Sequence, residues 1–157
     1  MDAGAFDELD MFRRIAESGA RALLIGRQAL VVLGLPVLTA DYDFWLHADD
    51  LAVFNAALAP LGLAASRSPA EARQFGRYVL ENSERIDVLV ARAVTTIDGQ
   101  RVEFEDIWQR RSSHPLTHKV AVFLPSIDDL IATKRFATRP HDAHDIRLLE
   151  TLRGRMS

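Results

Sequence analysis

Three aspartates stand out first, because carboxylates at their spacing can hold a divalent cation. Asp41 and Asp43 fall in residues 41–47, whose pattern predicts a strand. Side chains two positions apart in a strand share a face and lie roughly 6–7 Å from each other. Like charges on one face repel unless water or a cation compensates them. The pair is therefore a candidate Mg²⁺ site, since this ion takes carboxylate oxygens, waters and phosphates. The alternative is a pair of solvated acids at the exposed start of a strand.

The third aspartate, Asp87, is the only charged residue in the apolar run 86–91. Such a run is typical of a strand that is buried on both faces. A lone buried acid is costly, so we expect Asp87 to have a specific role. Either it joins Asp41 and Asp43 as a third metal ligand or general base, or it forms an ion pair with Arg85 or another base.

Gly26 stands at a turn from a predicted strand, residues 22–25, into a short apolar helix, residues 28–33. Because glycine has no Cβ, the backbone there can approach a phosphate, and the amides at the start of a helix favour anions. Glycine also serves ordinary tight turns, so a purely structural turn is the alternative.

A second group of metal-capable side chains lies near the C-terminus, in the sequence His141-Asp142-Ala143-His144-Asp145. A transition-metal site needs a converging set of ligands. The simpler interpretation is the polar first turn of a helix.

The elements that must position these residues alternate between helix and strand patterns, which predicts an α/β (α+β) fold class. Helices are predicted over residues 6–16, 28–33, 51–61, 126–138 and from 141 onward, and strands over residues 22–25, 41–47, 75–80, 85–91, 94–97 and 101–104. The pair Asp98-Gly99 predicts a hairpin between the last two strands, because both residues tolerate a positive φ. We expect the chain beyond them to be mostly helical, with His114 and His118 in a loop.

Composition sets the outer limits. A chain of 157 residues with 48% apolar content can form one core, so we expect a single domain, with an N-terminal helix (1–19), a core carrying the metal site (20–125) and C-terminal helices (126–157). The net charge of -3 argues against a chain built mainly to coat nucleic acid or an anionic membrane. The absence of cysteine fits a reducing compartment, and no apolar stretch approaches a membrane span, so we expect a cytoplasmic protein.

Four segments, in their order and spacing, resemble the nucleotidyltransferase superfamily, which has the DNA polymerase β-like fold. The resemblance is strongest to the short nucleotidyltransferases of toxin–antitoxin and abortive-infection systems. The segments are residues 24–29 (LIGRQA), 38–44 (LTADYDF), 85–89 (RIDVL) and 124–134 (LPSIDDLIATK). Arg139, Asp142 and Asp145 continue the pattern, so the resemblance covers about residues 20 to 150. It implies a mixed sheet flanked by helices, with further helices at the C-terminus.

The resemblance also implies roles for individual residues. Asp41, Asp43 and Asp87 correspond to the catalytic, metal-binding carboxylates. Candidate contacts to the nucleoside triphosphate are Gly26, Arg27, Thr39 and Lys134.

At two positions this sequence departs from the family pattern, and both lie in the part of the site expected to bind the triphosphate. The family usually follows its glycine with Gly or Ser, where this chain has Arg27, and a basic residue often found two positions before the threonine is here Val37. Arg27 either restores the missing positive charge or closes the site by pairing with Asp41 or Asp43.

Two functions follow from these expectations. The first is a Mg²⁺-dependent enzyme that moves a nucleotidyl group from a triphosphate to a hydroxyl on RNA or protein, within a toxin–antitoxin or phage-defence system. The second is a nucleotidyltransferase-like module that binds a toxin or antitoxin partner and transfers nothing. The three carboxylates favour the enzyme, and the altered Gly26-Arg27 turn favours the module. A metal-dependent phosphohydrolase with the same acids is a third, less favoured reading.

Overall fold

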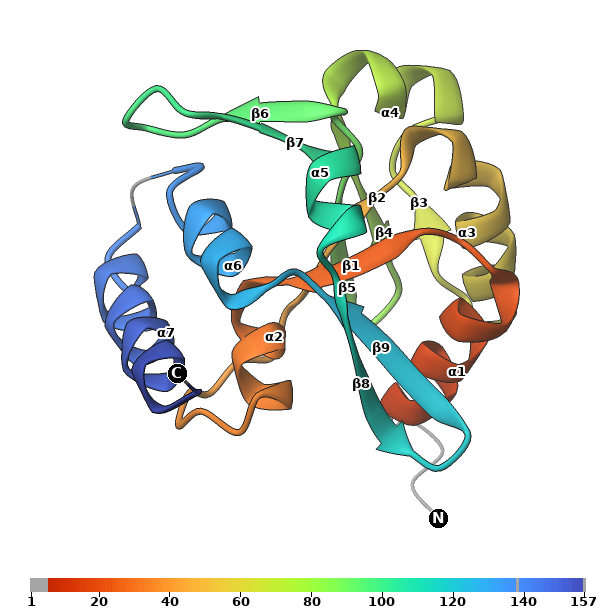
Figure 1. The fold of residues 1–157 in the computed structure, drawn as a ribbon. Helices are drawn as coiled ribbons and strands as arrows, with labels where there is room; N and C mark the ends of the chain where they lie inside the picture. The colour runs from red at the N-terminus through yellow and green to blue at the C-terminus, as the bar shows by residue number, and fades with distance from the viewer. Residues whose placement is uncertain (1–5, 138, 157) are drawn as a thin grey trace.

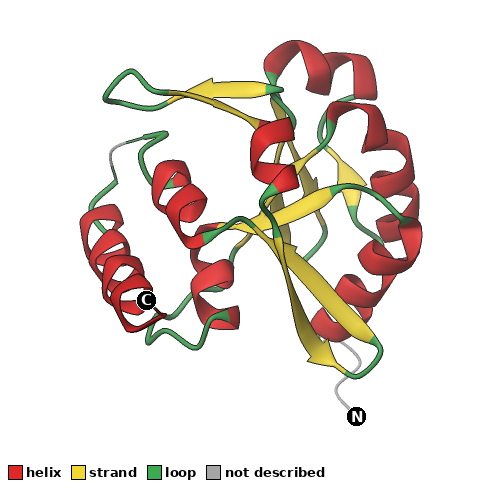
Figure 2. Cartoon of the chain, in the orientation of Figure 1, coloured by secondary structure: helices red, strands yellow, loops and turns green. Residues whose placement is uncertain are grey.

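The computed structural model describes residues 6–137 and 139–156, and its centre is a five-stranded mixed sheet (Figure 1). The strands are β1 (Ala22–Ile25), β2 (Tyr42–Leu46), β3 (Ala64–Ala65), β4 (Arg77–Glu81) and β5 (Arg85–Leu89), arranged in the order β1-β2-β5-β4-β3. Two hairpins stand apart from this sheet: β6 (Ala93–Thr95) with β7 (Arg101–Glu103), and β8 (Ser112–Thr117) with β9 (Val120–Leu124). The helices, shown in red in Figure 2, are α1 (Glu8–Ser18), α2 (Gly26–Val32), α3 (Leu51–Leu58), α4 (Pro69–Phe75), α5 (Phe104–Gln109), α6 (Ile127–Thr133) and α7 (Asp142–Met156).

The register of the central strands brings distant parts of the sequence together. Strands β2 and β5 run parallel, and Asp43 is the register partner of Asp87. Strands β1 and β2 are antiparallel, so Ile25, which immediately precedes Gly26, also pairs with Asp43. Asp43, Asp87 and the glycine turn therefore lie close together across three neighbouring strands of the sheet.

The two faces of the sheet bury two clusters, as alternation along a strand requires. Phe44 packs with α1 and α3 on one face, in contact with Phe12 and Phe54. Trp45 packs on the other face against Phe104, and its indole N–H donates to the carbonyl oxygen of Ala91 at 2.8 Å. No helix in the described part of the chain is long and apolar enough to cross a membrane.

Most predicted elements are confirmed, and the helix ends follow the expected signals. Gly19 and Gly62 close helical segments with a left-handed backbone, and Ser126 caps α6 by accepting a hydrogen bond from the Asp129 amide. The hairpin around Asp98-Gly99 forms as β6 and β7. The fold is the α/β class with a mixed sheet and C-terminal helices that the sequence predicted.

Two segments correct the predictions. The expectation of mostly helix after residue 104 is wrong for 112–124, which form the β8–β9 hairpin and place His114 in a strand. This hairpin packs against α1 and β1, so tertiary burial of Val120, Val122 and Leu124 selects strand. The strand predicted from residue 75 begins instead at Arg77, because α4 occupies the preceding residues.

Candidate active site

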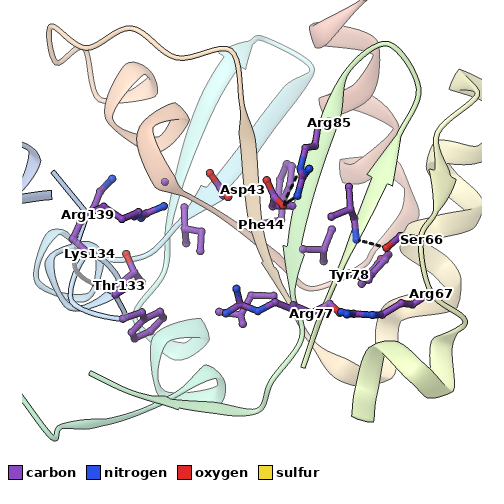
Figure 3. A pocket seen from close by; sticks show the side chains of 18 residues that line it. Asp43, Phe44, Ser66, Arg67, Arg77, Tyr78, Arg85, Thr133, Lys134 and Arg139 are labelled. Atoms are coloured by element: carbon purple, nitrogen blue, oxygen red, sulfur yellow. Dashed lines mark hydrogen bonds and ion pairs between the residues drawn. The ribbon is translucent and has the colours of Figure 1, made fainter. Parts of the chain in front are cut away.

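A pocket of about 550 Å³ opens beside the junction of β2 and β5 (Figure 3). Its walls come from β1, β2, β4 and β5 of the sheet, from the turn that starts α2, and from the segment that follows α6. Asp43 and Asp87 both line it, next to Gly26. The pocket is therefore where the sheet register gathers the residues singled out in the sequence.

Asp43 is a carboxylate of the pocket wall whose pKa is raised. Burial raises the pKa of its carboxyl to about 6, and the neighbouring charge of Asp87 adds to the rise. Arg139 and Lys134 act in the opposite direction, because their positive charges favour the ionised form. Among the described residues, however, no cation lies within ion-pair distance of Asp43, as expected of a carboxylate that holds a metal ion.

Gly26 is required by the place that Asp43 occupies. A Cβ built on Gly26 would lie 2.5 Å from Asp43 Oδ2, closer than any real contact, and the backbone φ of Gly26 is +68°. Only glycine accommodates both the close approach and the left-handed backbone. The turn and the acid are thus fitted to each other at the mouth of the pocket.

Asp87 is less buried than the sequence indicated, and the prediction of a strand covered on both faces is wrong. Ile86, Val88 and Val90 are buried, whereas the side chain of Asp87 is 41% exposed and faces the pocket. Arg85 approaches its carboxylate to 3.2 Å. The ion pair considered from the sequence is therefore present, and it lies on the pocket wall.

Asp41 and Thr39 lie just outside this arrangement. Asp41 precedes β2, is exposed and does not line the pocket. Its amide donates to Thr39 Oγ1 at 3.1 Å, so the threonine shapes the approach to the strand. Asp41 is still near enough for its charge to raise the pKa of Asp43.

Arg27 follows neither of the two courses considered for it. Its guanidinium forms an ion pair with Asp145 of α7 at 3.1 Å and donates to the carbonyl oxygen of Leu38 at 3.2 Å. It does not pair with Asp41 or Asp43 and does not line the pocket. The departure at this position therefore links α2 to the C-terminal helix.

Lys134 lines the pocket and shares Asp145 with Arg27. The Lys134 ammonium donates to Asp145 Oδ2 at 3.0 Å, and both side chains are almost fully buried. These bonds hold the pKa of Asp145 below its usual value despite the opposing effect of burial. Asp145 thus fixes Lys134 at the pocket wall. Figure 3 shows the lysine in this position.

The described residues contain one group of three possible ligand side chains with ligand atoms all within 4.8 Å of one another, namely His141, Asp142 and Asp145. Asp142 Oδ1 is buried without a hydrogen-bond partner. However, Asp142 pairs with Arg139, and Asp145 pairs with two cations. A further cation would meet net positive charge, so we assign this group to ion pairing.

The sequence analysis missed the pocket residues on either side of α4: Ser66, Arg67, Arg77 and Tyr78. They flank α4, whose start was readable from Ser68-Pro69-Ala70-Glu71. Ser68 and Glu71 form a reciprocal capping box, and proline occupies the first helical position. This signal would have predicted a helix before β4, with the residues that flank the helix close to the sheet.

No protein-family model matches the chain, and no curated protein matches its sequence. Solved structures do match it. The lincosamide antibiotic adenylyltransferase LnuA, solved with lincomycin bound, is 14% identical, with a TM-score of 0.62 over 92% of this chain and 96% of that one. The antibiotic-resistance factor ANT(2″)-Ia, solved in complex with adenylyl-2″-tobramycin, is 14% identical, with a TM-score of 0.64 over 90% of this chain and 84% of that one. The chain therefore has the fold of the nucleotidyltransferase superfamily.

Proposed function

We propose that this protein is a Mg²⁺-dependent nucleotidyltransferase that moves a nucleotidyl group from a nucleoside triphosphate to a hydroxyl on RNA or protein. One observation carries the proposal: Asp43 and Asp87 stand side by side on parallel strands in the pocket wall, and the pKa of Asp43 is raised to about 6. The proposed substrates place the reaction in the cytoplasm.

The donor set suits a hard divalent cation. Asp43 and Asp87 offer carboxylate oxygens in a pocket large enough for a triphosphate, and their mutual repulsion is relieved by a cation between them. Asp41, at the exposed start of β2, is the third ligand in the proposal. A metal ion held by these carboxylates would neutralise the phosphate charge that develops in such a reaction.

The reaction is an in-line displacement at the α-phosphorus. The acceptor oxygen forms a bond to this phosphorus. The bond from the α-phosphorus to the oxygen that bridges it to the β-phosphorus breaks, and pyrophosphate leaves with the electron pair. Asp87 takes the hydroxyl proton, and Lys134 lies across the pocket as a contact for the phosphates. Gly26 leaves the backbone open beside them, and Thr39 positions Asp41. Arg27 contributes through Asp145 and Lys134.

Incubation with each α-labelled triphosphate, Mg²⁺, bulk RNA and purified proteins tests the proposal. We expect label to transfer with the wild type. Transfer is lost with Asp43→Asn together with nucleotide affinity, because a metal ligand is removed. Asp87→Asn loses transfer but keeps more of the affinity than Asp43→Asn does, because Asp43 and Asp41 still hold the cation while the base that acts on turnover is removed. Asp106→Asn, an exposed acid of α5 outside the pocket, is the matched control.

A second function is favoured by one specific observation, the Arg85–Asp87 ion pair on the pocket wall. An arginine in that place fits a module that binds a toxin or antitoxin partner without catalysis. Such a module shows no label transfer with any acceptor. It also shows no Mg²⁺-dependent triphosphate binding in calorimetry, and Arg85→Gln does not restore either.

A further inference from the structure

The pocket has a second basic wall on the side away from α6. Arg67 precedes α4 and Arg77 starts β4, and both line the pocket. Figure 3 shows these two arginines on one side of Asp43, with Lys134 and Arg139 on the other. The carboxylates therefore lie between two groups of cations.

The two groups differ in how far their charge is compensated. Lys134 pairs with Asp145 at 3.0 Å, and Arg139 pairs with Asp142 at 3.3 Å. Within the described residues, neither Arg67 nor Arg77 has a carboxylate within ion-pair distance. The uncompensated positive charge of the pocket thus lies on the wall formed by Arg67 and Arg77.

Arg67 is held in place by contacts that leave its charge available. Its Nη1 donates to the carbonyl oxygen of Arg77 at 2.6 Å, and its guanidinium carbon lies 4.3 Å from the centre of the Phe75 ring. Glu71, the nearby acid, is engaged in the capping box with Ser68, whose hydrogen bonds lower the pKa of the Glu71 carboxyl, and the charge of Arg67 adds to the lowering. A guanidinium with free N–H donors matches the oxygens of a phosphate.

Phe75 lies next to this wall, in contact with Arg67, and does not itself line the pocket. The end of α4 leaves its side chain 59% exposed, an unusual position for a large aromatic ring. Exposed aromatic rings beside arginines are typical of surfaces on which unpaired bases stack while cations contact the backbone. A polycationic aminoglycoside such as tobramycin would be repelled here, and an uncharged acceptor would gain weaker hydrogen bonds from the two arginines than a phosphate does.

We propose that Arg67, Phe75 and Arg77 bind the acceptor, and that the acceptor is the end of a single-stranded RNA. The arginines contact a phosphate next to the reacting hydroxyl, and Phe75 stacks on a base. This inference rests on the proposed nucleotidyl transfer and identifies its acceptor class. It also fits the acidic net charge of the whole chain, because the basic surface is local.

The test measures binding without any triphosphate, so it does not depend on transfer. A short fluorescent oligoribonucleotide is titrated with the wild type, Arg77→Gln, Phe75→Ala and Arg101→Gln, with anisotropy as the readout at several salt concentrations. Arg101 is the matched control, since it is exposed on β7 and lies outside the pocket. Thermal unfolding of each variant verifies that it is folded.

We expect Arg77→Gln to weaken binding about tenfold, the loss of one charge-assisted contact. Its slope of log affinity against log salt falls by about 0.7, one phosphate contact on a single strand. Phe75→Ala weakens binding at an unchanged slope, because stacking releases no counterions. Arg101→Gln behaves as the wild type. Equal affinity and slope for Arg77→Gln and Arg101→Gln overturn the proposal.

Competition experiments separate the sources of phosphate. Displacement of the oligoribonucleotide by unlabelled RNA at much lower concentration than by inorganic phosphate or a phosphoserine peptide supports an RNA end. Displacement by the phosphopeptide at equal concentration overturns the RNA assignment. Label transfer to tobramycin or lincomycin with no RNA binding overturns this inference and leaves nucleotidyl transfer standing. RNA binding without transfer to any acceptor overturns the proposed function alone.

Discussion

At the residue scale, burial changes the acid–base chemistry of the Asp43 carboxyl. A folded-state pKa of about 6 against 3.8 means that the folded protein binds a proton more tightly than the unfolded chain does. The protonated Asp43 carboxyl therefore leaves the free energy of unfolding at its full value at low pH. This free energy falls as the pH rises through about 4 to about 6 and beyond, because the buried carboxyl must then ionise. The shift corresponds to about 3 kcal/mol at neutral pH.

The Asp43→Asn variant tests directly how much unfolding free energy the ionisation of Asp43 removes. Asp43→Asn cannot ionise, so we expect it to gain stability over the wild type by up to about 3 kcal/mol at pH 7.5 and by little at pH 4. Urea unfolding at the two pH values measures the difference. Mg²⁺ should stabilise the wild type at pH 7.5 and not the variant. A gain that is equal at both pH values would show that ionisation of Asp43 is not the source.

Gly26 offers a second residue-scale prediction with an internal control. Gly26→Ala suffers both a left-handed backbone and a clash with Asp43, whereas Gly34→Ala suffers only the backbone cost, since nothing lies within 4 Å of its added Cβ. We expect Gly34→Ala to lose about 1 kcal/mol in unfolding free energy and Gly26→Ala distinctly more. Chemical denaturation compares the two. Combining Gly26→Ala with Asp43→Ala should recover part of the excess, and no recovery would refute the clash.

At the element scale, three helices meet at one carboxylate. Asp145 on α7 is fully buried and bonds both Arg27 of α2 and Lys134 at the end of α6. The C-terminal helix thereby fixes the lysine that lines the pocket and holds the glycine-bearing helix beside it. This explains how Arg27 is accommodated next to Gly26 without entering the pocket.

Breaking this junction should be costly, because a removed partner leaves buried charge uncompensated. We expect Asp145→Asn to lose about 3–5 kcal/mol, and Arg27→Gln less, since Arg27 is partly exposed. Asp128→Asn, which breaks an exposed pair with Arg153, should cost under about 1 kcal/mol. Unfolding titrations of the three variants rank them. A loss for Asp145→Asn as small as that for Asp128→Asn would mean that the junction is not structural.

At the scale of the whole molecule, the mixed sheet decides which distant residues meet. The parallel pairing of β2 with β5 places Asp43 beside Asp87, although more than forty residues separate them in the chain. The helices divide around this sheet: α1 and α3 lie at one side of the molecule, and α6 and α7 lie at the other (Figure 1). The pocket opens between the sheet and the end of α6 with the segment that follows it.

The sequence by itself determined the elements whose signals are local. Apolar periodicity and glycine stops defined α1 and the end of the α3 segment, and Asp98-Gly99 defined a hairpin. The order of four short segments was enough to predict the nucleotidyltransferase fold. The helix stops and the hairpin depend on neighbours within a few residues, whereas the fold was predicted from a resemblance in the order and spacing of those segments.

The tertiary structure alone decided what each charged side chain faces. The alternation of side chains along a strand marks Asp43 as a candidate, but it says nothing about partners elsewhere in the chain. Arg27 pairs with Asp145 across 118 positions of sequence. Asp87 is half exposed and paired with Arg85. The β8–β9 hairpin forms because α1 and β1 bury it, and Arg67 and Arg77 reach the pocket because α4 folds between them. Burial and counter-charges are properties of contacts made by residues far apart in the chain, and for this reason they appear only once the fold is complete.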